Sequence, residues 1–178
     1  HRSVIAYANW VTETFDITEK TVFGNQTPFY FSMSVLDVFS TLKSGATLHI
    51  IPSGLFSFPV KLIEYMNEKQ VNTIYWVPSA LCIVANFKAL DYIKPEHLKK
   101  ILFAGEVMPV KQLNEWIRQM PEDTLFANLY GPTEITDICT YYVVNRSFDD
   151  SDVLPIGNAC NNCDVMIITA DNKEAEAG

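Results

Sequence analysis

The sequence is poor in basic residues and contains no long apolar run. Its 13 Lys and Arg residues are outnumbered by 21 Asp and Glu residues, which gives a net charge of −8. That charge repels a phosphate backbone, and no Lys/Arg cluster overcomes it locally, so nucleic acid is not expected as a partner. No run approaches the roughly 18 apolar residues that are needed to span a bilayer. Membrane insertion is therefore not expected either.

Cysteine is also scarce, because four cysteines in 178 residues are too few for a disulfide scaffold. Cys82 and Cys139 lie in apolar segments, where reduced cysteine packs as a small hydrophobic residue. Only Cys160 and Cys163 have the spacing of a metal or redox motif. A zinc site would need two more ligands, and the histidines show no ligand spacing with this pair. We interpret the segment as a loop.

The composition is that of an ordinary soluble globular domain, with 48% hydrophobic and 19% charged residues. The sequence starts at His1 without an initiating methionine or the apolar core of a signal peptide. It ends in a polar turn that is not followed by a closing element. We therefore expect a cytoplasmic chain that is an internal fragment of a longer protein.

Short β-rich runs alternate with amphipathic stretches from residue 46 onward, which is typical of βαβ units and a parallel sheet. Each amphipathic stretch is long enough for a crossover helix. We therefore predict an α/β fold with a mostly parallel sheet and helices on both faces. The predicted strands are 46–51, 71–77, 100–104, 124–130, 138–144 and 165–169, and the predicted helices are 3–14, 34–42, 60–69, 80–90 and 109–120.

Four loops follow predicted strands directly, and they begin at Pro52, Pro78, Gly105 and Gly131. In open parallel sheets, ligands bind outside the carboxyl ends of the strands, because helix N-termini and free backbone amides gather there. These four loops are therefore the candidate ligand-binding segments. The third loop contains Glu106, which lies one residue past a strand end. At that position the side chain could face solvent instead of a ligand.

The fourth loop carries the groups that a magnesium–nucleotide site needs. Tyr130 offers an aromatic face for a base, and Gly131 permits close approach of the backbone. Thr133 offers a hydroxyl, and Glu134 offers a carboxylate for a hard cation. The residue types alone leave a second interpretation open, in which Gly-Pro sets the backbone of a turn and Thr and Glu cap it.

Three segments resemble motifs of the adenylate-forming superfamily. Residues 128–134 (NLYGPTE) resemble the Y-G-P-T-E core motif of adenylation domains, and residues 31–39 (FSMSVLDVF) resemble the upstream F-D-x-S-V-x-[DE] motif. Residues 102–109 (LFAGEVMP) resemble the strand and loop between them. The segment 104–109 is most similar to D-alanine–carrier-protein ligases and to nonribosomal-peptide adenylation domains. The three motifs occur in the family's order and cover nearly all of the chain.

The resemblance implies a ligase that uses ATP and Mg²⁺ to activate a small carboxylic or amino acid. The acid would form an acyl-adenylate and then pass to the phosphopantetheine thiol of a carrier protein, or to CoA. Tyr130 would stack on adenine beside Asn128 and Gly105, Thr133 would hold phosphate, and Glu134 would bind the metal. The implied nucleotide-binding residues are Gly105, Glu106, Asn128, Leu129, Tyr130, Gly131, Pro132 and Thr133, and the implied catalytic residues are Thr133 and Glu134.

The implied acid pocket departs from the family pattern at Ser32. Members that activate amino acids carry an Asp there, which pairs with the substrate ammonium in a hydrogen bond worth roughly 1.5–3 kcal/mol. Asp137 lies at a pocket position that is usually apolar, and we hypothesise that it anchors the ammonium instead. The implied pocket residues are Ser32, Leu36, Ser79, Leu102, Ala104, Leu129, Asp137 and Ile138.

The resemblance places residues 1–178 inside the N-terminal AMP-binding domain of such an enzyme. The Gly-rich phosphate loop would precede His1, and the C-terminal domain with the catalytic lysine would follow Gly178, so the fragment alone is expected to be inactive. Two alternatives stay open. Ser32 favours an acyl- or aryl-CoA synthetase, and the chain could also be a non-catalytic α/β binding module in which residues 130–134 form only a turn.

Overall fold

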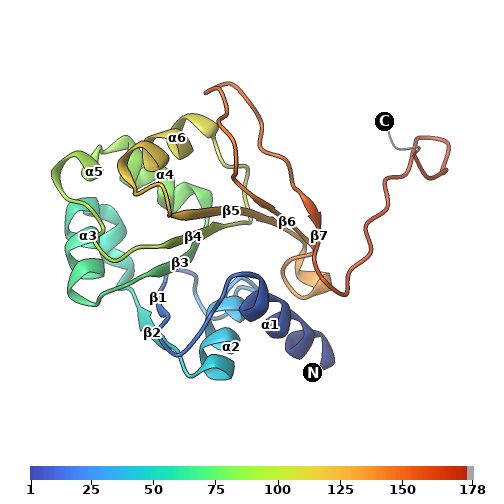
Figure 1. The fold of residues 1–178 in the computed structure, drawn as a ribbon, viewed down its shortest axis with the longest axis horizontal. Coiled ribbons are helices and arrows are strands. Elements are labelled where there is room, and N and C mark those ends of the chain that lie inside the picture. The colour runs from blue at the N-terminus through green and yellow to red at the C-terminus, as the bar shows by residue number, and fades with distance from the viewer. Residues whose placement is uncertain (176–178) are drawn as a thin grey trace.

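The computed structural model describes residues 1–175, which form one seven-stranded sheet with helices on both faces (Figure 1). The strand order is β2-β1-β3-β4-β5-β6-β7. The first five strands of this order are parallel, and the β5–β6 and β6–β7 pairs are antiparallel. The predicted α/β fold with a mostly parallel sheet is confirmed.

The elements are short, as is usual for a βαβ sheet. The strands are β1 (Val22–Asn25), β2 (Thr47–Ile50), β3 (Thr73–Trp76), β4 (Lys100–Phe103), β5 (Leu125–Tyr130), β6 (Thr140–Val143) and β7 (Asn158–Ala159). The α-helices are α1 (Arg2–Thr14), α2 (Ser34–Ser44), α3 (Pro59–Glu68), α4 (Pro78–Asn86), α5 (Ala89–Tyr92) and α6 (Val110–Gln119). The 3₁₀ helices are η1 (Ser53–Ser57) and η2 (Thr133–Ile135).

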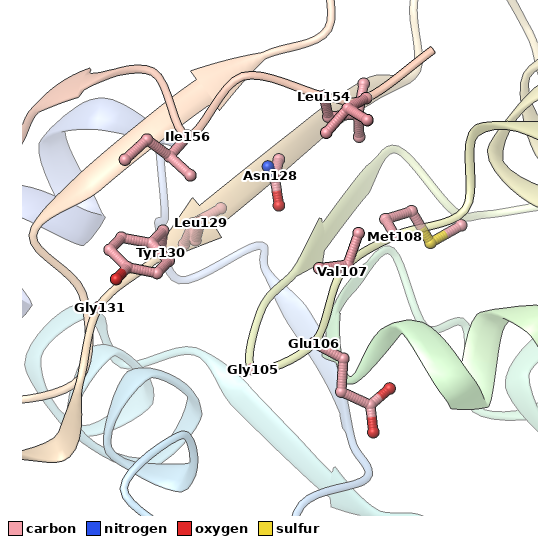
Figure 2. Close-up of a pocket in the computed structure, with 11 residues that line it drawn as sticks. Gly105, Glu106, Val107, Met108, Asn128, Leu129, Tyr130, Gly131, Leu154 and Ile156 are labelled. Carbon is pink, nitrogen blue, oxygen red and sulfur yellow. The ribbon is translucent and has the colours of Figure 1, made fainter. Parts of the chain in front are cut away.

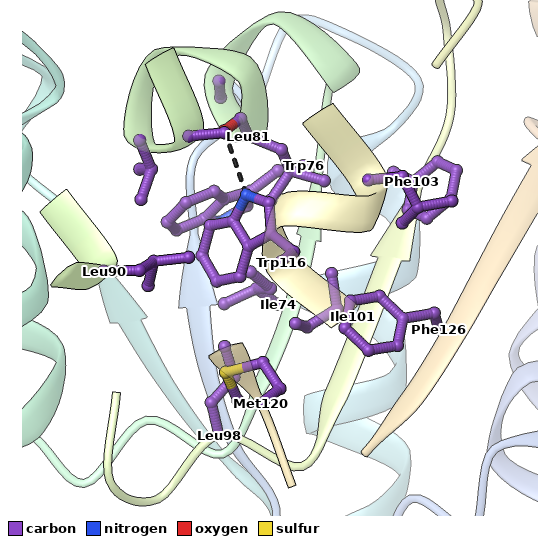
Figure 3. Packing of buried hydrophobic residues seen from close by; sticks show 14 of the residues in the cluster. Ile74, Trp76, Leu81, Leu90, Leu98, Ile101, Phe103, Trp116, Met120 and Phe126 are labelled. Atoms are coloured by element: carbon purple, nitrogen blue, oxygen red, sulfur yellow. Dashed lines mark hydrogen bonds between the residues drawn. The ribbon is translucent and has the colours of Figure 1, made fainter. Parts of the chain in front are cut away.

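Two hydrophobic clusters hold the layers together. Helices α3, α4, α5 and α6 cover one face of the sheet, and α1 and α2 cover the other (Figure 1). In the first cluster the buried Trp116 of α6 lies beside Trp76, and its indole nitrogen donates a hydrogen bond to the Leu81 carbonyl at 3.0 Å (Figure 3). The indole thus buries its ring without leaving its donor unpaired. In the second cluster Trp10 of α1 packs on the face of the sheet that α1 and α2 cover.

The local sequence explains where several helices begin and end. Helix α2 ends at Gly45, whose φ of 67° is in the left-handed region that glycine adopts without strain. Helices α3 and α4 both begin with proline, which fits the first turn because no amide hydrogen is needed there. The amphipathic stretch predicted as a helix at 109–120 forms α6, in which Val110, Leu113 and Trp116 are buried.

Several predicted boundaries are wrong. The helix predicted at 80–90 is two helices, α4 and α5, because Lys88 between them takes a left-handed φ of 51°. The strand predicted at 165–169 is absent from the described chain, where Ile168 makes only an isolated bridge to Glu174. Met166 and Ile167 are exposed, so no packing partner stabilises a strand there. Strands β1 and β7 were not expected from the sequence.

None of the helices formed by residues 1–175 is both long enough and apolar enough to cross a membrane.

Candidate functional site

A cavity of about 330 Å³ lies at the carboxyl ends of β4 and β5 (Figure 2). Three segments that are distant in sequence line it: the loop after β4, the end of β5, and the segment that leads into β7. Its volume is within the range of about 300–1,000 Å³ that is usual for small-molecule sites. The lining residues are Gly105, Glu106, Val107, Met108, Asn128, Leu129, Tyr130, Gly131, Val153, Leu154 and Ile156.

The cavity combines an exposed aromatic ring with apolar walls and polar edges. The Tyr130 side chain is 52% exposed beside Ile156 (Figure 2). The Asn128 amide donates to the Pro155 carbonyl at 2.9 Å and so fixes the segment before β7 against β5. Gly105 has a φ of +87°, where other L-residues are strained. A flat aromatic ligand such as a nucleobase fits walls of this kind.

Glu106 lines the cavity, but its carboxylate is bonded to helix α4. The Ser79 amide donates to Glu106 Oε2 at 2.8 Å, and the Ser79 hydroxyl donates to Oε1 at 3.2 Å. In Figure 2 the carboxylate accordingly points away from Asn128 and Tyr130. Glu106 thus satisfies one of the free amides in the first turn of α4 and places negative charge at its N-terminus.

We expect Glu106→Ala to lower the free energy of unfolding by about 1 kcal/mol, the usual effect of losing a helix-capping group. Chemical denaturation of the full-length protein measures this. Glu122→Ala is the matched control, because Glu122 is exposed in a turn and its loss should change stability by less than about 0.5 kcal/mol. Equal stability of the two variants would contradict a capping role.

The motif loop continues from the cavity into the short helix η2. Thr133 and Glu134 are exposed at its start, so both can reach a bound molecule. The Thr133 and Ser32 hydroxyl oxygens lie 3.0 Å apart and share a hydrogen bond. Thr136 and Asp137 follow with φ values of 69° and 79°, and left-handed residues other than glycine cost on the order of 1 kcal/mol or more each. The rest of the fold therefore holds this loop in a strained shape.

Most of the implied acid-pocket residues lie together on the α1–α2 side of the sheet. Leu36, Leu102, Ala104, Leu129 and Ile138 all belong to the second hydrophobic cluster and are no more than 3% exposed. They therefore share one layer of the core. Ser79 differs from them, since it is exposed and bonded to Glu106.

Asp137 is the charged member of the implied pocket, and it is only 3% exposed. Tyr7 donates a hydrogen bond to Asp137 Oδ2 at 2.7 Å, and Tyr75 donates to the same oxygen at 3.0 Å. Burial raises the pKa of Asp137, while hydrogen bonds from Tyr7, Tyr75 and Ser32 oppose that shift. Asp37 lies fully buried nearby, and burial raises its pKa to about 8.

Sequence reasoning missed two parts of this arrangement. Tyr7 and Tyr75 were not identified, because nothing in their local sequence separates them from ordinary core aromatics. The cavity wall formed by Val153, Leu154 and Ile156 was also missed, since it comes from a segment without regular structure. Only the folded sheet brings these residues to the predicted motifs.

The chain is similar to curated proteins along its whole length. It is 32% identical over 180 residues to an L-proline–[L-prolyl-carrier protein] ligase of Pseudomonas fluorescens, covering 100% of this chain and 36% of that protein. It is 30% identical over 182 residues to a D-alanine–D-alanyl carrier protein ligase of Bacillus anthracis, covering 100% of this chain and 35% of that protein. The chain thus spans about a third of the length of these relatives.

A solved structure has the same fold. It is the adenylation domain AlmE of Vibrio cholerae in complex with glycyl-adenosine-5'-phosphate, with a TM-score of 0.82 and 24% sequence identity, covering 97% of this chain and 32% of that one. The family model described as AMP-binding enzyme matches residues 1–178. With three motifs in the family's order, and with two of them lining one cavity, the chain belongs to the AMP-binding enzyme family.

Proposed function

We propose that the protein containing this chain activates a small amino acid with ATP and transfers the aminoacyl group to the thiol of a carrier protein. The observation that carries the proposal is the cavity at β4 and β5, which joins Gly105, Asn128 and the aromatic ring of Tyr130 in one site. Thr133 and Glu134 follow directly, and Thr133 is hydrogen-bonded to Ser32 of the acid side. The site for a nucleotide and the site for an acid therefore meet at Thr133.

The roles proposed for these residues are those that the family resemblance implies. Tyr130 presents its ring to adenine, with Asn128 and Gly105 at the edge of the base. The hydroxyl of Thr133 would hold phosphate, and Glu134 would be the protein ligand for Mg²⁺. The substrate carboxylate would attack the α-phosphorus, and pyrophosphate would leave. A magnesium ion held by Glu134 would supply positive charge for the phosphate oxygens. Positioned donors and charge are the main means of catalysis for such a displacement.

The relatives support an amino acid as the substrate and a carrier protein as the acceptor. Two of them are named as ligases of proline and of D-alanine to carrier proteins, and the AlmE structure holds a glycyl-adenylate. Each of these acids has a small side chain. The buried pocket residues of this chain, of which Leu36, Leu102 and Leu129 are at most 2% exposed, favour a small side chain as well.

Ser32 supports a second candidate, an acyl- or aryl-CoA synthetase. A substrate without an α-amine needs no carboxylate at that position, and Ser32 supplies none. The buried carboxylate of Asp137 argues against this candidate, because a substrate without an ammonium group would leave it without a counter-charge.

ATP–pyrophosphate exchange by the full-length protein tests the proposed function. We expect Mg²⁺-dependent exchange with one or more small amino acids, and little with hydroxy acids, aryl acids or short fatty acids. Preference for an acid without an amine would favour the CoA synthetase. A folded protein that exchanges with no acid and does not bind Mg-ATP would contradict both candidates and favour a non-catalytic binding module.

A further inference from the structure

One carboxylate in the acid-pocket region is held by two buried phenols. Tyr7 belongs to α1, Tyr75 to β3, and Asp137 to the loop after η2. Both tyrosines donate to Oδ2 of Asp137, at 2.7 and 3.0 Å. The two phenol rings are 6% and 0% exposed, so neither can leave its position freely. Three separate elements of the fold therefore meet at one oxygen atom.

This arrangement holds the buried carboxylate through one of its two oxygens. A carboxylate has two oxygens and about four acceptor positions, so two donors on Oδ2 leave Oδ1 with unused capacity. Rotation of the carboxylate would break both tyrosine hydrogen bonds. The hydroxyl of Ser32 is the third group that lowers its pKa. Asp137 thus lies beside position 32, where the family pattern has the ammonium-binding Asp.

The charge of Asp137 has no cationic partner in the described part of the chain. Its pKa is raised by its own burial and lowered by hydrogen bonds from three neutral hydroxyls. The other buried carboxyl nearby, Asp37, has the same sign of charge. An ionised carboxylate in such surroundings is costly unless a cation accompanies it. An ammonium group on a bound substrate would provide that cation.

We propose that Tyr7 and Tyr75 are positioning residues that hold Asp137 as the ammonium-binding carboxylate of a small amino acid substrate. This inference rests on the proposed function. The negative charge that Ser32 lacks is supplied from the adjacent loop, and the two phenols determine where it lies. Hydrogen bonds to the charged form also oppose the rise in the pKa of Asp137 that its burial causes.

The test is ATP–pyrophosphate exchange by the full-length protein with its best amino acid and with the matching acid that lacks the amine. Asp137→Asn should raise the KM for the amino acid by about 10- to 100-fold, the range for losing a charged hydrogen bond. Tyr7→Phe and Tyr75→Phe should each raise it by about tenfold. The KM for ATP should stay the same in all three variants.

A pH profile separates positioning from a general loss of structure. Removing a phenol donor favours the protonated form of Asp137, so the acid limb of kcat/KM for the amino acid should move to higher pH in Tyr7→Phe and Tyr75→Phe. Tyr142→Phe is the matched control, because it removes a hydroxyl that donates to Asn145 at 3.2 Å. This variant should change neither the KM for the amino acid nor the pH of the acid limb.

The outcomes distinguish this inference from the proposed function. If the wild-type protein exchanges equally well with the amino acid and the amine-free acid, ATP-dependent activation of an acid stands, and the ammonium site is refuted. If the Tyr variants raise both KM values alike and leave the acid limb in place, the positioning role is refuted. A wild-type protein that exchanges with no acid overturns the proposed function itself, and the inference with it.

Discussion

Gly131→Ala should lower ATP–pyrophosphate exchange by about 100-fold, because a displacement of about 1 Å in a catalytic site can cost that much. A Cβ atom at position 131 would lie 2.6 Å from the Ile138 Cα and 2.8 Å from the Cys139 amide nitrogen, and closer still to the Asp137 carbonyl oxygen. All three are backbone atoms, which cannot move aside as a flexible side chain can. The loop that carries Asp137 would therefore have to shift away from Tyr130.

The same substitution should also lower stability by about 1–3 kcal/mol, the usual cost of overpacking. Gly54→Ala is the matched control, since a Cβ at Gly54 would meet no atom within 4 Å. It should leave exchange unchanged and stability within about 0.5 kcal/mol. Exchange kinetics and chemical denaturation of the two variants measure both effects. A Gly131→Ala protein with wild-type exchange would show that the close contact between residue 131 and the loop at 137–139 has no part in catalysis.

The parallel core of the sheet could be predicted because its strands carry strong local signals. Strands β3, β4 and β5 are apolar runs bounded by turn residues, and the motif loops follow two of them. Strand β1 gives no such signal, since Val22–Asn25 contains only one Val and one Phe beside a Gly and an Asn. It forms because it pairs with both β2 and β3 and because Trp76 donates to the Gly24 carbonyl at 2.7 Å. Those are long-range contacts that no window of sequence contains.

The candidate site was predictable only in part, for a similar reason. The loops that begin at Gly105 and Gly131 were expected at one edge of the sheet, because the carboxyl ends of neighbouring parallel strands lie there, and both glycines line the cavity. Asn128 and Tyr130 were added to them by the family resemblance. The partners of Asp137 depend on how α1 packs beneath the sheet. Tyr7 is 130 residues from Asp137 in sequence, and its helix shows only an amphipathic pattern. Such a pattern predicts a buried face but not which hydroxyl meets which carboxylate.

The buried carboxyl of Asp37 should make stability fall as pH rises. Burial and the charge of Asp137 raise its pKa to about 8, although Asn25 donates to its Oδ2 at 2.8 Å. In the unfolded chain an Asp titrates near about 3.9. Between these values the folded state holds one more proton than the unfolded state, so the free energy of unfolding falls by about 1.4 kcal/mol per pH unit. From pH 5 to pH 8 the loss is about 4 kcal/mol.

Asp37→Asn should remove this contribution, because an amide of nearly the same shape stays neutral at every pH. The variant and the wild-type protein should have similar stability near pH 4, and the variant should be the more stable one by several kcal/mol at pH 8. Denaturant titrations of the full-length protein at pH 5, 6, 7 and 8 measure the difference. Asp171→Asn, at an exposed position, should leave the pH dependence as it is. Parallel curves for wild type and Asp37→Asn would contradict a buried, proton-binding Asp37.

The two buried carboxyls should also be coupled. The charge of Asp137 is one cause of the raised pKa of Asp37, so Asp137→Asn should lower that pKa below about 8. The pH range over which Asp37 reduces stability would then end at a lower pH. A bound ammonium at Asp137 should act in the same direction, because it cancels the same charge. Curves of stability against pH for the wild-type protein, with and without its amino acid, would therefore report the ammonium site without any measurement of catalysis. If the amino acid left the upper pH limit of the Asp37 effect unchanged, that result would argue against the ammonium site.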